Sequence, residues 1–198
     1  MLIVKLSNEE SVEMNITLAI NVNIGDITEL KVKRIQETVG EKFVSCVFMP
    51  GQLIMSSDKE QLILNQSQIQ YSFDHNDYST IKETINKILD LLMIESLVPH
   101  ALVLINEIKN IGKDAMSFTK SEFGSLISNS IGVGKREFFV FNDLLCEIRV
   151  EPFVNNTNCI YVECKYNLKD IYINNINLIL KQVENDYNSK CKEIYSKI

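Results

Sequence analysis

The sequence predicts an α+β fold, in which an antiparallel sheet packs against helices. Segments with apolar residues at alternate positions, typical of half-buried strands, occur in both halves of the chain. Each half then ends in a longer segment whose apolar residues recur every three or four positions, as on one face of a helix. Because strands come first and a helix follows, we expect helices packed on an antiparallel sheet.

The composition is that of a folded chain with a sizeable core. Apolar residues make up 45% of the 198 residues, and charged residues make up 23%. These values exclude a disordered or low-complexity chain, and a chain of this length buries about 70% of its unfolded surface. We expect a single α+β domain over 1–198. A repeat described below would divide it into two closely packed halves, about 1–98 and 99–198.

The first half is predicted to consist mainly of strands. Alternation is strict from Met14 to Ile24, which predicts a half-buried antiparallel strand. Gly25 and Asp26 predict a turn, and the alternate apolar residues of 27–35 extend the strand pattern. Further strands are predicted at 42–48, 53–55, 61–65 and 69–73, with a turn at Pro50 and Gly51.

A helix is predicted to close this half. Asp77 can cap a helix that runs to Ile94 and carries one apolar stripe. Pro99 separates this helix from the range 101–111, which predicts a strand. The apolar run 103–105 is equally typical of a buried helix.

The second half is predicted to hold a short helix, three strands and a long helix. Ser117 or Thr119 can cap the short helix, which is expected to include Phe123, Leu126 and Ile127. The ranges 131–134 and 154–158 predict a loop and a turn, and the ranges 138–141, 144–152 and 159–166 predict strands. The range from 170 to about 196 predicts a helix with an apolar stripe through Ile173, Ile176, Ile179, Leu180 and Val183.

The two halves match at a fixed offset of 91 residues. The offset aligns 69–73 with 160–164, 85–89 with 176–180, and 53–54 with 144–145. Ordinary amphipathic patterning can produce such matches, so a duplication and a coincidence both stay open.

Charge and cysteine content indicate an acidic protein of a reducing compartment. The net charge is −6, which argues against a nucleic-acid partner. Five Cys is an odd number without a C-x-x-C pair, so we expect reduced, mostly buried thiols and a cytoplasmic protein. Charged residues interrupt the apolar start of the chain, so no signal peptide is expected. No apolar run reaches the roughly 18 residues of a membrane span, so no membrane partner is expected.

Patterns typical of catalysis are absent from the sequence. The motifs G-x-S-x-G, H-E-x-x-H and G-x-G-x-x-G do not occur. His75 beside Asp74 is interpreted as part of a solvated turn, and neither His has a nearby Cys with which to bind zinc. Glu147, Glu151 and Glu163 are interpreted as the solvated face of a sheet. We therefore predict no catalytic residue, no metal site and no cofactor.

One loop is a candidate anion site. Gly132, Gly134, Lys135 and Arg136 combine flexible backbone with two cations, which suits a phosphate or an acidic partner. The loop lacks the spacing of a phosphate-binding loop, and strand-like residues follow it where such a loop has a helix.

The range from Leu53 to Ile111 resembles a sporadically distributed family of uncharacterised bacterial proteins. The resemblance rests on Q-L-I-L-N at 61–65, on Tyr78 at the start of a helix, and on A-L-V-L-I-N-E-I at 101–108. The order of strands and then a helix is also similar to that of the SecB-like chaperone fold. The first resemblance implies no activity, and the second implies binding of unfolded polypeptide on exposed apolar grooves.

Five phenylalanines are candidate partner-binding residues: Phe43, Phe48, Phe138, Phe139 and Phe141. They lie on predicted strands with apolar residues on both faces. The chain's own helices, a second subunit or a client must cover such strands. We therefore predict a non-enzymatic protein-binding module, chaperone-like or adaptor-like, with a protein partner and a homo-oligomeric state.

Two alternative functions stay open. A phage or mobile-element inhibitor of a host defence enzyme is consistent with the acidic charge and with the heavy use of Ile, Asn and Lys, which often accompanies an AT-rich genome. An enzyme is possible if scattered acids converge in the folded chain. Co-purification from a lysate separates these functions, because a chaperone retains many clients, an inhibitor retains one enzyme, and an enzyme retains neither.

Overall fold

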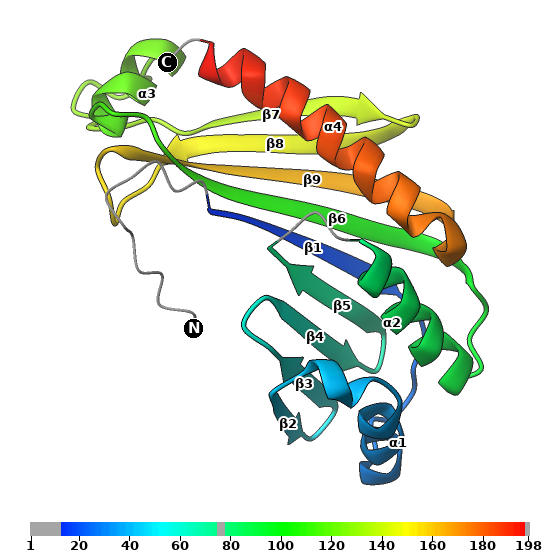
Figure 1. Ribbon diagram of the computed structural model, residues 1–198. Helices are drawn as coiled ribbons and strands as arrows, with labels where there is room; N and C mark the ends of the chain where they lie inside the picture. Colours follow the sequence, from blue (N-terminus) through cyan, green and yellow to red (C-terminus); the bar gives the residue numbers. More distant parts are fainter. Residues whose placement is uncertain (1–12, 75–77, 197–198) are drawn as a thin grey trace.

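Nine antiparallel strands form one sheet, and the described helices cover one of its faces (Figure 1). The computed structural model describes residues 13–74 and 78–196. The strands are β1 (Glu13–Asn21), β2 (Ser45–Met49), β3 (Gln52–Ser56), β4 (Glu60–Asn65), β5 (Gln68–Phe73), β6 (Leu97–Asn110), β7 (Lys135–Phe141), β8 (Leu144–Pro152) and β9 (Cys159–Tyr172). Their order across the sheet is β2-β3-β4-β5-β1-β6-β9-β8-β7. The helices are α1 (Glu29–Val39), α2 (Ser79–Leu91), α3 (Ala115–Phe123) and α4 (Ile176–Tyr195). The predicted α+β fold with an antiparallel sheet is confirmed.

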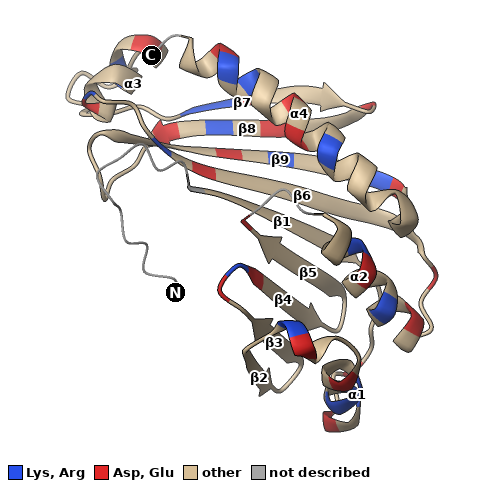
Figure 2. Cartoon of the chain, in the orientation of Figure 1, with Lys and Arg blue, Asp and Glu red and all other residues tan. Residues whose placement is uncertain are grey.

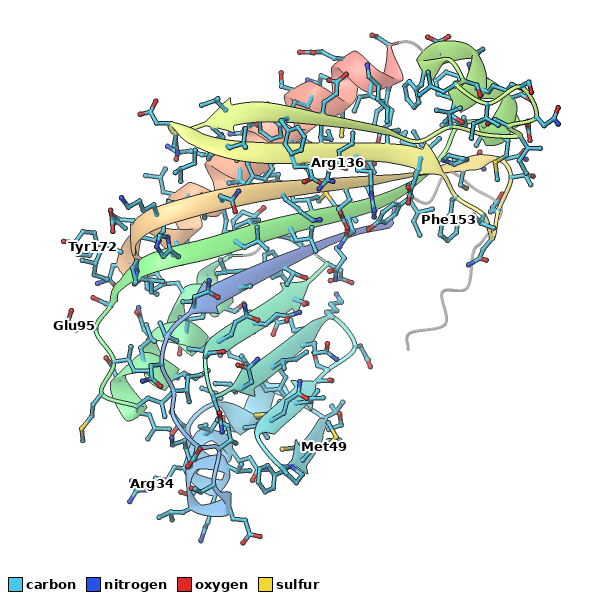
Figure 3. All side chains as sticks on the ribbon, turned by 180° about the vertical axis from the view of Figure 1, so that it is seen from behind. Arg34, Met49, Glu95, Arg136, Phe153 and Tyr172 are labelled. Atoms are coloured by element: carbon cyan, nitrogen blue, oxygen red, sulfur yellow. The ribbon has the colours of Figure 1, made fainter. Side chains whose placement is uncertain are left out.

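The alternation of apolar residues decides which face the helices cover. Leu18 of β1 lies opposite Tyr71 of β5 and Val103 of β6, and all three side chains are fully buried. Because successive side chains of a strand point to opposite faces, the neighbours of these residues point away from the helices. We call that second side of the sheet the open face. It lies toward the viewer in Figure 3, where the strands stand in front of the helices.

The segment predicted to extend the first strand is helix α1. The prediction of strand over 27–35 is therefore wrong. The Thr28 hydroxyl accepts a hydrogen bond from the backbone N–H of Lys31, which caps the helix. The buried residues are Val32, Ile35 and Val39, which follow the helical period. The alternate apolar residues at the start of the segment produced the strand pattern.

Two strands are longer than the sequence predicts. β6 begins at Leu97 and so includes Pro99, which we placed outside the strand. Pro99 is tolerated because β1 ends opposite His100, so no strand on that side requires an N–H from residue 99. On its other side the pairing with β9 skips Pro99 and Asp170, and the φ of 51° at Asp170 interrupts the ladder there. β9 correspondingly runs to Tyr172, so α4 begins at Ile176 and not at 170.

The short helix of the second half begins and ends earlier than predicted. Asp114, and not Ser117 or Thr119, caps α3, since its carboxylate accepts the Ser117 N–H at 2.7 Å. The helix ends at Phe123, because Gly124 follows with a φ of 73°. Leu126 and Ile127 therefore lie in the exposed loop that leads to β7.

Both halves follow the order strand, helix, strands, helix. β1 and β6 pair at the centre of the sheet, with β5 beside β1 and β9 beside β6. The aligned ranges 69–73 and 160–164 fall in β5 and β9, and α2 and α4 follow these two strands. The aligned ranges 53–54 and 144–145 do not correspond, because β4 separates β3 from β5 whereas β8 pairs directly with β9. A duplication stays a prediction. By place in the sheet β4 corresponds to β8 and β3 to β7, so β2 has no counterpart in the second half.

The cysteines are free, and four of the five are buried. All five lie in the described ranges, and only Cys46 is exposed. This agrees with the prediction of reduced, mostly buried thiols that was based on the odd number of cysteines. The start of the chain, on which the expectation about a signal peptide rests, lies outside the described residues. Among the described helices, none combines the length and apolar character needed to cross a membrane.

Two leucines of α4 test the packing of this helix. Leu180 is 1% exposed and Leu178 is 61% exposed, so one belongs to the core and the other to the surface. We expect Leu180→Ala to lower the free energy of unfolding by about 2–5 kcal/mol, because it leaves a cavity under the helix. The matched change Leu178→Ala should cost less than about 0.5 kcal/mol. Urea denaturation of both variants measures this difference, and equal values would contradict the packing of α4.

Candidate functional site

The five candidate phenylalanines do not form one surface. Phe43, Phe139 and Phe141 point to the helix side and pack against tyrosines of the core, Phe43 on Tyr71 and the other two on Tyr166. Phe48 and Phe138 are exposed, but they lie on β2 and β7, at opposite edges of the sheet. The register places Phe48 on the helix side and Phe138 on the open face. The chain's own helices therefore cover three of the five.

The two cations of the candidate anion loop point in opposite directions. Lys135 faces the helix side and forms an ion pair with Glu137. Arg136 faces the open face, where its guanidinium donates to Glu147 at 2.5 Å. The structure therefore does not bring both cations to one anion.

The glycines of this loop have a packing role. A Cβ at Gly132 would lie 2.5 Å from the Met116 sulfur, and one at Gly134 would lie 3.3 Å from the Glu151 Cβ. A side chain at either glycine would therefore require its neighbours on α3 or β8 to shift.

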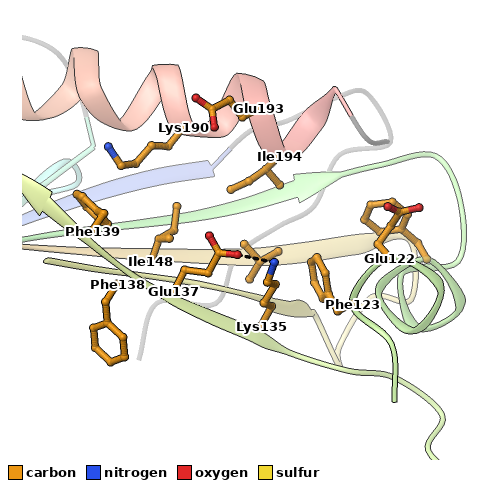
Figure 4. Close-up of a pocket in the computed structure, with 12 residues that line it drawn as sticks. Glu122, Phe123, Lys135, Glu137, Phe138, Phe139, Ile148, Lys190, Glu193 and Ile194 are labelled. Atoms are coloured by element: carbon orange, nitrogen blue, oxygen red, sulfur yellow. Dashed lines mark ion pairs between the residues drawn. The ribbon is translucent and has the colours of Figure 1, made fainter. Parts of the chain in front are cut away.

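A cavity of about 260 Å³ lies between the C-terminal end of α4, helix α3 and strands β7 and β8 (Figure 4). Its lining residues are Phe118, Glu122, Phe123, Lys135, Glu137, Phe138, Phe139, Ile148, Val150, Lys190, Glu193 and Ile194. Three of the sequence-predicted candidates, Lys135, Phe138 and Phe139, are among them. In Figure 4 the ring of Phe138 points away from the others, as its place on the open face requires. We call this space the α4–β7 cavity.

The wall of the α4–β7 cavity is apolar, and its rim is charged. Phe118, Ile148 and Val150 are buried, whereas Glu122 and Glu193 are exposed. Lys135 is neutralised by Glu137, and its ammonium lies 5.8 Å from the centre of the Phe123 ring. Neither Glu122 nor Glu193 has an ion-pair partner within the described residues. The rim therefore carries an excess of negative charge.

A tight hairpin places β7 along the cavity. Asn142 and Asp143 form the two-residue turn between β7 and β8, and both have positive φ, of 49° and 61°. Asn and Asp tolerate this conformation, which matches the twist of paired strands. In the resulting register Lys135, Glu137 and Phe139 all point to the helix side. β7 is also the last strand of the sheet, so its outer edge has no strand partner in the described chain.

A buried carboxylate holds the C-terminal end of α4 above the cavity. Glu107 of β6 is only 5% exposed, and its Oε2 accepts hydrogen bonds from the hydroxyls of Tyr187 at 2.6 Å and Tyr195 at 2.7 Å. The thiol of Cys191 lies 3.8 Å from the same oxygen. These three donors are spaced four residues apart and share one face of the helix. Burial raises the pKa of the Cys191 thiol to about 12, and it also raises the pKa of both tyrosines.

A second polar contact fixes the helix beside β7. The Tyr166 hydroxyl donates to Asp186 at 2.8 Å, and the Lys190 ammonium donates to the same Asp186 oxygen at 2.6 Å. The Lys190 ammonium also lies 4.1 Å from the centre of the Phe139 ring. This cation–π contact joins α4 to β7 at the wall of the α4–β7 cavity.

The acids that β8 and β9 place on the open face form ion pairs. Glu147 lies between Arg136 and Lys165, and Glu163 lies between Lys165 and Arg149. The hydrogen bond from Arg136 holds the pKa of Glu147 below its usual range, so this carboxyl stays ionised. Figure 2 shows charged bands on β7, β8 and β9, whereas β1 and β5 are almost free of charge. These acids do lie on a polar sheet face, but the Glu147 and Glu163 side chains are only 14% and 12% exposed, so their ion pairs shield them from solvent.

Metal and histidine chemistry gain no support from the described residues. No group of three or more His, Cys, Asp or Glu in the described ranges could hold a metal ion. His75 and Asp77 lie outside those ranges. His100 is exposed on the open face, opposite Asn21 and Lys169.

Comparison with known proteins leaves the site to be interpreted from its own geometry. No protein-family model matches this sequence. No curated protein matches it with significance either.

Sequence analysis missed nine of the twelve lining residues, among them all three that α4 contributes. Lys190, Glu193 and Ile194 reach the cavity beside the buried stripe that contains Tyr187 and Cys191. Their spacing of three and four is the helical signal that could have placed them together. Nothing in the sequence indicated that this face of α4 lies next to β7.

The hydroxyl of Tyr187 tests the anchoring of α4. Tyr187→Phe removes one donor and leaves the buried Glu107 carboxylate with fewer hydrogen bonds, which we expect to cost about 1–3 kcal/mol of unfolding free energy. Tyr172→Phe is the matched control, since Tyr172 is exposed and its hydroxyl makes no hydrogen bond to described residues. Urea denaturation compares the two, and an equal effect of both changes would contradict the role of Glu107.

The same cluster predicts a loss of stability at alkaline pH. The pKa of Cys191 rises from 9.0 to about 12 on folding, so the folded protein holds this proton more tightly than the unfolded chain. The stability that this group contributes is therefore complete below pH 9 and is lost as the pH rises toward 12. The buried tyrosines act in the same direction. Urea midpoints measured across this range should fall steadily, and a constant midpoint would refute the expectation.

Proposed function

We propose that this protein is a non-enzymatic, cytoplasmic protein-binding module that holds an extended segment of its partner along β7. The observation that carries the proposal is the α4–β7 cavity, which opens beside a strand with a free edge. A peptide strand added to such an edge gains backbone hydrogen bonds, and side-chain pockets beside the edge give specificity.

The side-chain period of a strand supports this mode of binding. Lys135, Glu137 and Phe139 of β7 all point to the cavity side. An added strand follows the same alternation, so every second side chain of the bound segment would point to that side. The volume of about 260 Å³ lies below the roughly 300–1,000 Å³ of pockets for drug-sized ligands and suits one or two side chains.

The chemistry of the cavity selects the bound segment. Phe118, Phe123 and Ile148 favour an apolar side chain as the anchor. Glu122 and Glu193 on the rim favour a Lys or Arg two residues before or after it. The same carboxylates, together with the net charge of −6, oppose a phosphate backbone, which supports a protein partner over a nucleic acid.

The ionisable groups of the lining suit binding. The lining contains no Ser, Thr, Cys or His, and of its three carboxylates Glu137 pairs with Lys135 while Glu122 and Glu193 are exposed on the rim. Both lysines of the lining are ion-paired, Lys135 with Glu137 and Lys190 with Asp186. The five free cysteines support the cytoplasm as the compartment.

Selection from a library of random linear peptides tests the proposal. Peptides selected on the wild-type protein should carry an apolar residue flanked at alternate positions by Lys or Arg. We expect Glu193→Lys to weaken their binding on the order of tenfold, because it replaces an attraction at the rim with a repulsion. Glu95→Lys makes the same charge change at an exposed site in the loop before β6, and it should leave the affinity unchanged.

Hydrogen exchange then locates the bound peptide. Binding should slow exchange of the β7 amides and leave those of β2 unaffected. Peptides that bind Glu193→Lys as tightly as wild type, or that protect another part of the sheet, would refute binding at the α4–β7 cavity. The proposal would also be refuted if no peptide sequence were enriched on the protein relative to the matrix without protein.

A further inference from the structure

Strand β2, which has no further strand partner among the described residues, lacks the features that usually prevent strands from pairing. Every residue of β2 is exposed. Its sequence, S-C-V-F-M, contains no charge and no proline. Val44 before it is also exposed, so six successive side chains at this edge, 44–49, meet solvent. Exposed, uncharged edges with unpaired backbone groups are templates for another strand, and proteins normally protect them with charges or Pro.

The other edge of the same sheet is charged. β7 begins with Lys135, Arg136 and Glu137, so a strand that pairs along that part must offer side chains that complement these charges. β2 is therefore an uncharged edge strand, and β7 is a charged one. The charged edge adjoins the α4–β7 cavity.

We propose that β2 pairs with β2 of a second copy of this chain, antiparallel and about a twofold axis, so that two sheets join into one. A twofold pairing sets the strand against itself, so the surface must be self-complementary. Whether Cys46, Val47 or Phe48 lies on the axis, no charged side chain enters the pair. Within each chain Val47 lies beside Ile54 on the open face, and Phe48 lies beside Leu53 on the helix side.

A second copy suits β2 better than the opposite edge of the sheet does. Pairing of β2 with β7 would oppose charged and apolar residues, and its head-to-tail geometry would continue into a fibre. Pairing of β2 with itself closes after two chains. The contact is short, at the lower end of interface sizes, so the dimer should dissociate on dilution.

Analytical ultracentrifugation tests this dimer with two matched valines. Val47 on β2 is 50% exposed and Val140 on β7 is 69% exposed, and both point to the open face. The wild-type mass should rise with concentration from 22.7 kDa toward twice that value. Val47→Lys should stay monomeric, because it introduces a charge into an uncharged edge that must pair with itself. Val140→Lys should dimerise as wild type does.

Hydrogen exchange at low and high protein concentration provides the second measurement. Dimerisation should slow exchange in residues 44–49 alone, and melting curves should show that both lysine variants are folded. A wild-type protein that is monomeric at every concentration would overturn the proposal. So would a Val47→Lys dimer, or concentration-dependent protection at β7 in place of β2. The dimer test at β2 is independent of the peptide-binding test, because peptide binding is measured at β7.

Discussion

The position of α4 depends on one buried carboxylate. Apolar contacts through Leu180 and Val183 decide which face of the helix meets the sheet, but such contacts are not directional. Glu107 adds direction, because a buried carboxylate is costly unless donors reach it at hydrogen-bond distance. Tyr187 and Tyr195 meet that requirement only when the last turns of α4 lie directly over β6. The α4–β7 cavity exists because the helix end is held there.

The two halves share an order of elements but present different surfaces. On the open face, β5 contributes Gln68, Gln70 and Ser72, whereas β8 contributes Glu147, Arg149 and Glu151. α4 has 20 residues and α2 has 13, and α4 extends along a cavity beside an edge strand. One edge of the described sheet is therefore charged and adjoins a cavity, and the other is uncharged. A sheet with two unlike edges can make two kinds of contact at once without competition between them.

Sequence patterns predicted the strands well and the site poorly, for a physical reason. Alternation is a local property, so β1, β5 and β8 could be located from residues a few positions apart. α1 was missed because Leu30 and Val32 imitate a strand until the Thr28 cap and the later residues Ile35 and Val39 are weighed. The cavity joins β7 to the last turns of α4, and such a contact depends on packing angles that no local pattern specifies. Phe138 and Phe139 were both candidates, yet only the register separates the ring on the open face from the ring against Lys190.

The place of β1 in the sheet has a consequence for how the chain is made. β1 is the first strand of the described chain but lies at the centre of the sheet, where Thr17 pairs with Ser72 on one side and Leu104 on the other. On the ribosome, β1 must therefore remain unpaired until β5 and then β6 have emerged. Contacts of such long sequence separation slow folding. During that interval Ile16, Leu18 and Ile20 have no sheet to cover them, so the nascent chain depends most on cellular folding assistance before its second half is synthesised.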